Sequence, residues 1–211
     1  MKRFWRCHDG ALPPLLALAL NPGLDGDMFS PHPLVAALKA RASADDSWRP
    51  TTFPRGASLM RQGEPRDSLF VLTEGLVKLT YLSAQGDEWI KSVIVDQGLF
   101  GSLGGLEAGS RFGATLVEAS TIVELPGQWL RRALAEDSSI AAGSAAFLGW
   151  LAERKQAREE ALLCQTAEDR YRTLLVDEPA LLARLPQGDV ARFLRVTPVA
   201  FSRIKRRMRL P

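Results

Sequence analysis

The sequence predicts an α+β fold: an antiparallel, jelly-roll-like β-roll, then a long helix, then a C-terminal helix-turn-helix. Three observations support this prediction. Short β-rich runs fill residues 52–125, the apolar period becomes helical after Pro126, and two short helices joined by a tight turn are expected near the C-terminus. The chain has 211 residues, 46% hydrophobic and 24% charged, which excludes a wholly disordered or collagen-like chain and accommodates two compact units.

Six short strands are expected in residues 52–125, because β-rich runs alternate there with turn residues at close intervals. They are Ser58–Arg61, Leu69–Leu72, Leu76–Leu82, Trp89–Val95, Ala114–Val117 and Thr121–Leu125. Apolar and polar residues alternate through Leu76–Leu82, so one face of that strand should be buried and the other exposed to water. The glycine-rich residues 98–109 are expected to connect two strands. This spacing indicates a sandwich or roll rather than a βαβ sheet.

Helices are predicted on both sides of the β-rich region, at Leu34–Arg41, at Gln128–Leu134 and, as one long helix, from Ile140 to about Val176. Apolar residues recur in the long helix at spacings of three and four, and Phe147, Leu151 and Leu162 belong to this stripe. Such a stripe packs either on its own domain or against a second copy of the helix. A helix of roughly 30 residues is about 45 Å long, more than the face of a small domain, so we favour a second copy.

The run from Gln187 to Lys205 predicts two short helices. Thr197 followed by Pro198 is typical of an N-cap with proline at the first helical position, so the second helix should begin there. Phe201 and Ile204 would face the first helix. The side chains expected to face outward, and so to bind, are those of Thr197, Val199, Ser202, Arg203, Lys205, Arg206 and Arg207.

Charge is unevenly distributed along the chain. The net charge is +3, but residues 184–211 carry eight basic side chains and one acidic side chain, a balance of +7, which leaves −4 for the remainder. A short basic end on an acidic body is typical of a module that binds a polyanion. A solvated basic tail on a purely structural helical hairpin is the alternative. Because the basic residues coincide with the two helices, we favour a helix-turn-helix whose second helix enters the major groove of double-stranded DNA.

The order of these motifs resembles that of the CRP/FNR superfamily of bacterial transcription regulators. The resemblance covers about residues 30–208 and rests on Phe53-Pro54-Arg55-Gly56, Gly63-Glu64, Leu76-Val77-Lys78-Leu79, Phe100-Gly101, Ala167-Glu168-Asp169-Arg170-Tyr171 and the helix-turn-helix. It implies an extension at 1–29, a cyclic-nucleotide-binding-like sensor roll at 30–137, a dimerisation helix at 138–176 and a DNA-binding domain at 177–211. It further implies a cytoplasmic homodimer that acts with RNA polymerase.

The sensor roll departs from the members of the family that bind cyclic AMP. Those members carry a glutamate for the ribose hydroxyl where this chain has Ser102, and an Arg-Ser pair for the phosphate where it has Phe112 and Gly113. Arg111 is one position out of register. A buried phosphate without a guanidinium partner is poorly compensated, so we expect cyclic AMP to bind no better than millimolar. The candidate pocket for another, unidentified effector comprises Gly101, Ser102, Leu103, Gly104, Arg111, Ala114 and Thr115.

The DNA-binding end also departs from the family. Val199 stands where many members have a glutamate that accepts from cytosine, and Arg195 stands at the turn position usually held by glycine. A left-handed backbone at Arg195 would cost on the order of 1 kcal/mol. The sequence ends three residues after Met208, so no β-hairpin wing is expected after the second helix, and DNA affinity should depend more heavily on dimerisation.

Other chemistry has weak support. The two cysteines, Cys7 and Cys164, offer no disulfide framework, and Cys7-His8 lacks a metal-ligand spacing. Residues 101–105 resemble a phosphate loop without its lysine. We find no carboxylate pair or catalytic triad, so we expect no metal, no cofactor and no enzyme.

The N-terminal residues raise two further hypotheses. Basic residues precede the apolar residues 11–20, which superficially resembles a signal peptide, but Pro13 and Pro14 interrupt the run. No apolar run approaches the length of a membrane span, so we expect a cytoplasmic protein without a membrane partner. We expect residues 1–27 to be dispensable, with Met28 as an alternative start. The competing functional hypotheses are a sensor that acts through protein partners after losing DNA binding and, third, an unrecognised enzyme.

Overall fold

The computed structural model describes residues 32–104, 107 and 109–208. The hypotheses about the N-terminal extension, Cys7-His8 and Met28 lie outside these residues. Two compact units divide the chain between Leu151 and Ala152, inside one helix, and each is considered by itself.

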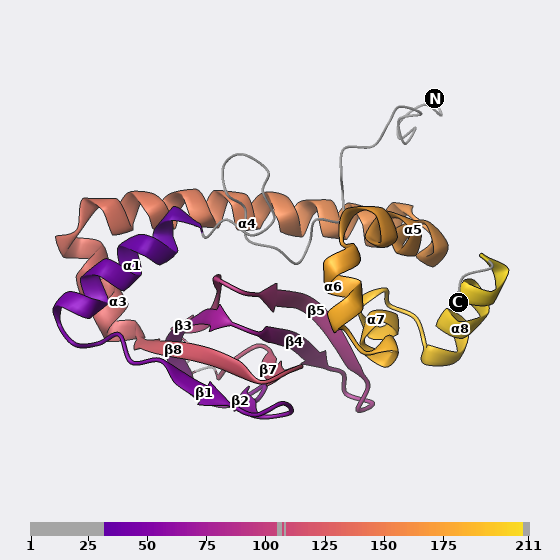
Figure 1. Ribbon diagram of the computed structural model, residues 1–211, viewed down its shortest axis with the longest axis horizontal. Coiled ribbons are helices and arrows are strands. Elements are labelled where there is room, and N and C mark those ends of the chain that lie inside the picture. The colour runs from indigo at the N-terminus through magenta and orange to yellow at the C-terminus, as the bar shows by residue number, and fades with distance from the viewer. Residues whose placement is uncertain (1–31, 105–106, 108, 209–211) are drawn as a thin grey trace. The chain divides into compact units, whose positions relative to one another are not determined.

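The first unit contains the predicted β-roll. Its strands form two four-stranded antiparallel sheets, ordered β1-β8-β3-β6 and β2-β7-β4-β5 (Figure 1). The strands are β1 (Thr51–Phe53), β2 (Ser58–Met60), β3 (Arg66–Glu74), β4 (Leu76–Leu82), β5 (Glu88–Val95), β6 (Gly98–Gly104), β7 (Gly113–Leu116) and β8 (Ser120–Pro126). The six strands expected from the sequence are present, with shifts of a few residues at their ends.

Two strands, β1 and β6, were not expected. Treating residues 98–104 as part of a connection was wrong: β6 pairs with β3 from Ser68 opposite Ser102 to Leu72 opposite Gly98. Gly98 and Gly101 allow neighbouring residues to approach closely, whereas Gly104 has a φ of 75° and open space around it. A Cβ on Gly101 would lie 2.5 Å from the Ser68 carbonyl oxygen, and one on Gly98 would lie 2.3 Å from the Ile94 side chain. A glycine in a strand can therefore indicate a neighbouring chain at close range.

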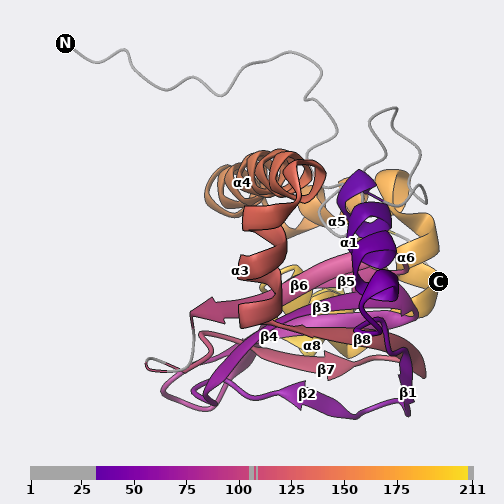
Figure 2. The ribbon, with the colours of Figure 1, turned by 90° about the vertical axis from the view of Figure 1, so that its left-hand side faces the viewer.

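The first unit has two hydrophobic cores, one on each face of the β1-β8-β3-β6 sheet. Along β3, Phe70 and Leu72 point into the core between the two sheets, whereas Leu69 and Val71 point into a core covered by helices. Both faces of this strand are buried, which explains its continuous apolar run. Figure 2 shows the helices α1 (Pro33–Ala44) and α3 (Gly127–Glu136) over this sheet.

The helices of the first unit are tied together by side-chain contacts. The indole Nε1–H of Trp129 on α3 donates to an Asp45 carboxylate oxygen at the end of α1, at 2.8 Å. Phe147, on the next helix, packs against the helix-covered core, with its ring centroid 5.3 Å from that of His32. Phe147 therefore packs within its own unit, and this weakens its assignment to a contact between two copies of the chain.

The predicted single helix from Ile140 to Val176 is wrong in length. Helix α4 spans Ser138–Cys164, and a separate helix, α5, spans Ala167–Asp177. The hydroxyl oxygen of Thr166 accepts from the Asp169 N–H at 3.1 Å, so Thr166 is the N-cap of α5. The Thr-x-x-Asp pattern that begins the second helix was present in the sequence and was overlooked.

The second unit is helical in its described part. It comprises the end of α4 with α5, α6 (Pro179–Arg184), α7 (Gln187–Phe193) and α8 (Pro198–Arg207). The predicted helix-turn-helix is formed by α7 and α8, and no strand follows α8 within the described residues.

Candidate nucleic-acid interface

The turn between α7 and α8 has a defined hydrogen-bonding pattern. The Val196 N–H donates to the Ala191 carbonyl at 3.0 Å, and the Arg195 N–H donates to the Arg192 carbonyl at 3.3 Å. These two bonds form a Schellman motif, which requires a left-handed residue after the helix end. Arg195 is that residue, with φ of 62°. The backbone at this turn is therefore left-handed, and it is carried by an arginine rather than a glycine.

The start and the packing of α8 agree with the sequence prediction. The Thr197 hydroxyl oxygen accepts from the Ala200 N–H at 3.2 Å, and Pro198 takes the first helical position. Phe201 and Ile204 are buried, and the ring of Phe201 meets that of Tyr171 edge to face at 4.8 Å. The face of α8 opposite these residues is consequently turned toward solvent.

The buried Arg170 and the half-buried Arg158 both donate hydrogen bonds to the end of α7. Arg158 donates to the Phe193 carbonyl at 2.9 Å and lies over the Phe193 ring, and Arg170 donates to the Leu194 carbonyl at 2.8 Å. Burial lowers the pKa of Arg158 to about 10, which still leaves its guanidinium charged at neutral pH, and burial also lowers the pKa of Arg170. Cations at the carboxyl end of a helix interact favourably with the negative end of its dipole. They fix the turn from which α8 begins.

The outer face of α8 presents most of the predicted binding residues. Val199 is 63% exposed, and Thr197, Ser202, Arg203 and Arg206 are exposed as well. Within the described residues, Arg203 and Arg206 have no hydrogen bond or ion pair, so both guanidinium groups are available to a ligand. The half-buried Lys205 has its ammonium 3.3 Å from the side-chain oxygen of Gln187.

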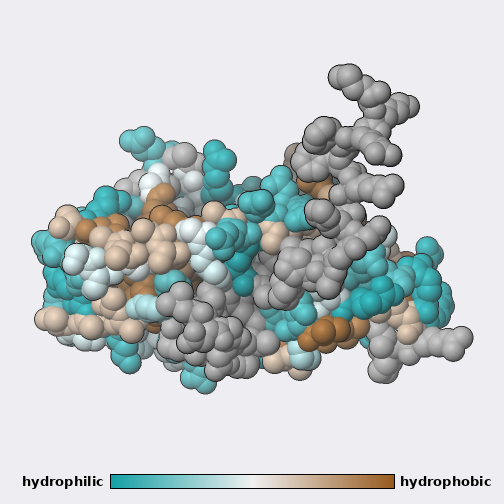
Figure 3. All heavy atoms as spheres, turned by 90° about the horizontal axis from the view of Figure 1, so that it is seen from above, coloured by the Kyte–Doolittle hydropathy of each residue, from teal (hydrophilic) through white to brown (hydrophobic). Residues whose placement is uncertain are grey.

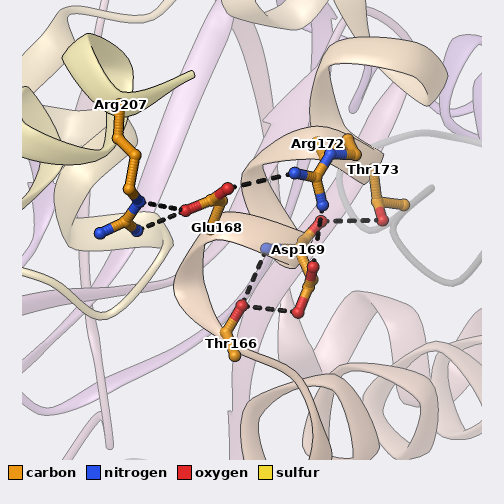
Figure 4. A network of polar contacts seen from close by, with 6 residues as sticks. All are labelled: Thr166, Glu168, Asp169, Arg172, Thr173 and Arg207. Atoms are coloured by element: carbon orange, nitrogen blue, oxygen red, sulfur yellow. Dashed lines mark hydrogen bonds and ion pairs between the residues drawn. The ribbon is translucent and has the colours of Figure 1, made fainter.

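Arg207 differs from the other predicted binding residues. Its Nε–H donates to a Glu168 carboxylate oxygen at 2.6 Å, and the two side chains form an ion pair (Figure 4). Glu168 also accepts from Arg172 at 3.1 Å, and Arg172 reaches Asp169 at 2.9 Å. Arg207 therefore joins the end of α8 to the start of α5. The sequence predicted an outward-facing Arg207 but not this partner, because Glu168 is 39 residues away along the chain.

A buried acidic group lies at the junction of α5 and α6. Glu178 is fully buried, and neither of its carboxylate oxygens has a hydrogen-bond partner within the described residues. Burial raises the pKa of Glu178 to about 7, Asp177 adds to the rise and the nearby Arg154 opposes it. Burial in turn lowers the pKa of Arg154 to about 10. This cluster was not predicted, because in the sequence Arg154 is one of several charged residues that interrupt the apolar stripe of the expected long helix.

The candidate effector residues lie on two different sheets. Gly101, Ser102, Leu103 and Gly104 belong to β6, whereas Ala114 and Thr115 belong to β7. Leu103 and Arg111 are exposed. Ala114 is fully buried in the core between the sheets, so its side chain cannot line an open pocket.

Lys91 is a residue that sequence reasoning missed near the candidate pocket. Its ammonium lies 4.0 Å from the ring centroid of Phe112, the residue in the register position of the phosphate-binding arginine, and 5.6 Å from that of Tyr81. A cation therefore stands beside this position although the arginine is missing. Only cross-strand packing brings Lys91 there, so no local motif could have indicated it.

The described residues contain neither a cluster of metal-ligating side chains nor a helix that could span a membrane. There, no group of three or more histidine, cysteine, aspartate or glutamate side chains is placed to hold a metal ion. Likewise, none of the helices the structure describes is long and apolar enough to cross a membrane.

Comparison with known proteins finds a matching family for part of the first unit. Residues 50–137 match the family described as the cyclic nucleotide-binding domain. Two relatives, both named CRP-like cAMP-activated global transcriptional regulator and both from Mycobacterium tuberculosis (strains CDC 1551 / Oshkosh and ATCC 25618 / H37Rv), are 28% identical over 123 residues. These residues are 58% of this chain and 48% of each relative, so the chain spans about half the length of the curated relatives it matches.

Solved structures share the fold of the cyclic nucleotide-binding domain and of the helices after it. FixK2 from Bradyrhizobium japonicum has a TM-score of 0.68 at 18% identity, covering 77% of this chain and 84% of that one. The c-di-GMP responsive global regulator CLP from Xanthomonas campestris has a TM-score of 0.69 at 15% identity, covering 82% of this chain and 91% of that one. The solved structures confirm the predicted fold class, and the two Mycobacterium tuberculosis relatives named CRP-like bear out the resemblance to CRP/FNR regulators.

Proposed function

We propose that this chain is a dimeric, cytoplasmic transcription regulator that binds double-stranded DNA through α8 and acts with RNA polymerase. The observation that carries the proposal is the exposed face of α8, where the guanidinium groups of Arg203 and Arg206 stand clear of every described partner. The buried side of the same helix is fixed by Phe201 and Ile204. A rigid helix with unpaired arginines on its free face suits insertion into the major groove.

Each exposed residue has a proposed role. Arg203 lies one turn into α8, where its guanidinium group can donate two hydrogen bonds, to O6 and N7 of a guanine. Arg206 and Lys205 lie further along and would contact phosphates, as would Thr197 and Ser202 through their hydroxyl groups. Arg207 would contribute less, because a phosphate must compete with Glu168 for it.

Selection of binding sites from random DNA, followed by titration on the selected site, tests this function. We expect a two-fold symmetric site whose half-sites are centred about 10 base pairs, or a multiple of that, apart. Arg203→Ala should cost roughly 1–3 kcal/mol and relax the preference at one base pair per half-site. Arg132→Ala, which changes an exposed arginine of α3, is the matched control and should leave the selected sequence unchanged. If no DNA is selected, the alternative of a sensor acting through protein partners gains support.

Salt dependence separates Arg206 from Arg207 in the same assay. Arg206→Ala should weaken binding to cognate and to random DNA alike. It should also reduce the slope of log affinity against log salt concentration by about one unit per half-site. Arg207→Ala should reduce it by less, because part of its charge is already balanced by Glu168. An equal reduction of the salt slope in both variants would mean that DNA displaces Glu168 from Arg207.

The sensor roll is proposed not to respond to cyclic AMP. Ser102 and Phe112 replace the glutamate and arginine that the resemblance would require, and the ammonium of Lys91 is engaged with the Phe112 ring. We expect titration calorimetry to give a dissociation constant no better than millimolar, whereas a micromolar constant would overturn this part of the proposal. For another effector, Ser102, Leu103 and Arg111 are the first residues to substitute.

Self-association is proposed to use the free face of α4. Leu148 is 62% exposed, and at 100° per residue Leu151 and Leu162 lie within about 60° of it around the helix. Figure 3, which looks down on α4, shows apolar atoms gathered over its N-terminal half. Phe147 lies about 100° from Leu148 and packs into its own unit, so it falls outside this stripe.

A further inference from the structure

The first turn of α8 offers an apolar surface and few hydrogen-bond donors. Pro198 has no N–H group, and the Ala200 N–H is already bonded to the Thr197 hydroxyl at 3.2 Å. Pro198 and Val199 are both exposed, and Val199 keeps 63% of its surface. In a helix that otherwise exposes serine and arginine, this apolar turn needs an explanation.

Val199 lies on the same face of α8 as the proposed base-reading residue. Ser202 and Arg203 follow it by three and four residues, so the three side chains are neighbours on the helix surface. The N-terminal residues of a recognition helix are those that approach base edges. A ligand that meets Arg203 would therefore also meet Val199.

The chemistry of the major groove leaves one good partner for this valine. Hydrogen-bond donors and acceptors line the groove, and the 5-methyl group of thymine is its apolar feature. A donor or acceptor pressed against Val199 would lose its water without a replacement. Resting on the proposed function, we infer that Val199 is a specificity-determining residue that reads a thymine through its 5-methyl group. The thymine would lie about two base pairs from the guanine read by Arg203, because four helical residues rise about 6 Å.

Replacing thymine by deoxyuridine tests this inference, because it removes the methyl group and leaves base pairing intact. Each thymine of the selected site is replaced in turn, and affinity is measured for the full-length protein. One position per half-site should lose about fourfold in affinity, the value of one buried methyl group. Val199→Ala should bind thymine and deoxyuridine alike at that position. Val176→Ala, which alters another exposed valine of the same unit, is the control and should keep the discrimination.

A gain-of-preference variant completes the experiment. Val199→Glu should shift the selected base at the same position from thymine to cytosine, whose amino group a carboxylate can accept from. If the protein binds a specific sequence but no replacement of a thymine by deoxyuridine changes its affinity, the inference is overturned and the proposed function stands. Absence of any selected sequence would overturn both.

Discussion

At the scale of single residues, burial rather than sequence context sets the chemistry of the second unit. Arg158, Arg170 and Glu178 occur in stretches that alternate charged and apolar residues, where each would ordinarily be exposed. Folding buries Arg170 and Glu178 and half-buries Arg158, and the two arginines donate to carbonyl oxygens at the end of α7. Those partners are more than 20 residues away along the chain. The exposed residues of α8 could be predicted because they follow local helical periodicity, whereas these long-range contacts could not.

Glu178 should make the stability of the protein fall as pH rises. Its pKa is about 7 when folded, against 4.5 for the ordinary group, so between these values the unfolded chain binds fewer protons than the folded one. Stability is then lost over this range, by about 3 kcal/mol, and levels off above pH 7. Glu178→Gln should remove this contribution and be more stable than wild type at pH 8.

Urea unfolding at pH 5 and pH 8, followed by circular dichroism, measures this effect. Glu160→Gln removes an exposed carboxylate of α4 and serves as the control, which should keep the wild-type pH dependence. A Glu178→Gln variant whose stability changes with pH as steeply as that of the wild type would contradict the assignment.

At the scale of elements, local signals placed most strands and helices correctly. Leu76–Leu82 alternates and is observed as β4 with the predicted bounds, and Thr197-Pro198 starts α8 as expected. The errors arose where one residue type can occupy two different structural positions. The glycines of β6 were interpreted as turn residues although they allow close packing, and Thr166 was passed over as part of one long helix although it caps a new one.

The turn between α7 and α8 carries a strain that a substitution should relieve. Arg195 has a φ of 62°, a conformation that costs a side-chain-bearing residue about 1 kcal/mol and costs glycine little. Arg195→Gly should therefore raise the free energy of unfolding by up to about 1 kcal/mol, measured by thermal denaturation. Arg192→Gly, inside α7, should instead lower it by about 1 kcal/mol. A loss of stability in both variants would show that the contacts of the Arg195 side chain outweigh its backbone strain.

At the scale of the whole molecule, the order of parts was predictable from the sequence. A β-rich region, a long apolar-striped helix and a basic helical end appear in that order both in the sequence and in the structure. The face of α4 that is free for a partner was not predictable, because periodicity identifies apolar positions without saying which of them the chain itself covers. Phe147 is covered by its own unit and Leu148 is not.

That difference yields a direct test of dimerisation. Leu148 and Leu163 are 62% and 77% exposed, so replacing both by glutamate should leave folding intact. In a two-fold dimer each substitution acts twice, because the same surface is buried on both copies. We expect Leu148→Glu with Leu163→Glu to sediment as a folded monomer at micromolar concentration, with DNA affinity falling toward that of a single half-site.

Wild-type protein and Leu82→Glu, which changes a 54% exposed leucine at the end of β4, should both remain dimeric in the same experiment. Because one copy presents a single recognition helix, it should hold DNA weakly, and monomers should lose sequence-specific binding at physiological salt. A wild-type monomer that nonetheless binds the selected site tightly would refute the need for a second copy and assign the exposed leucines of α4 to another role.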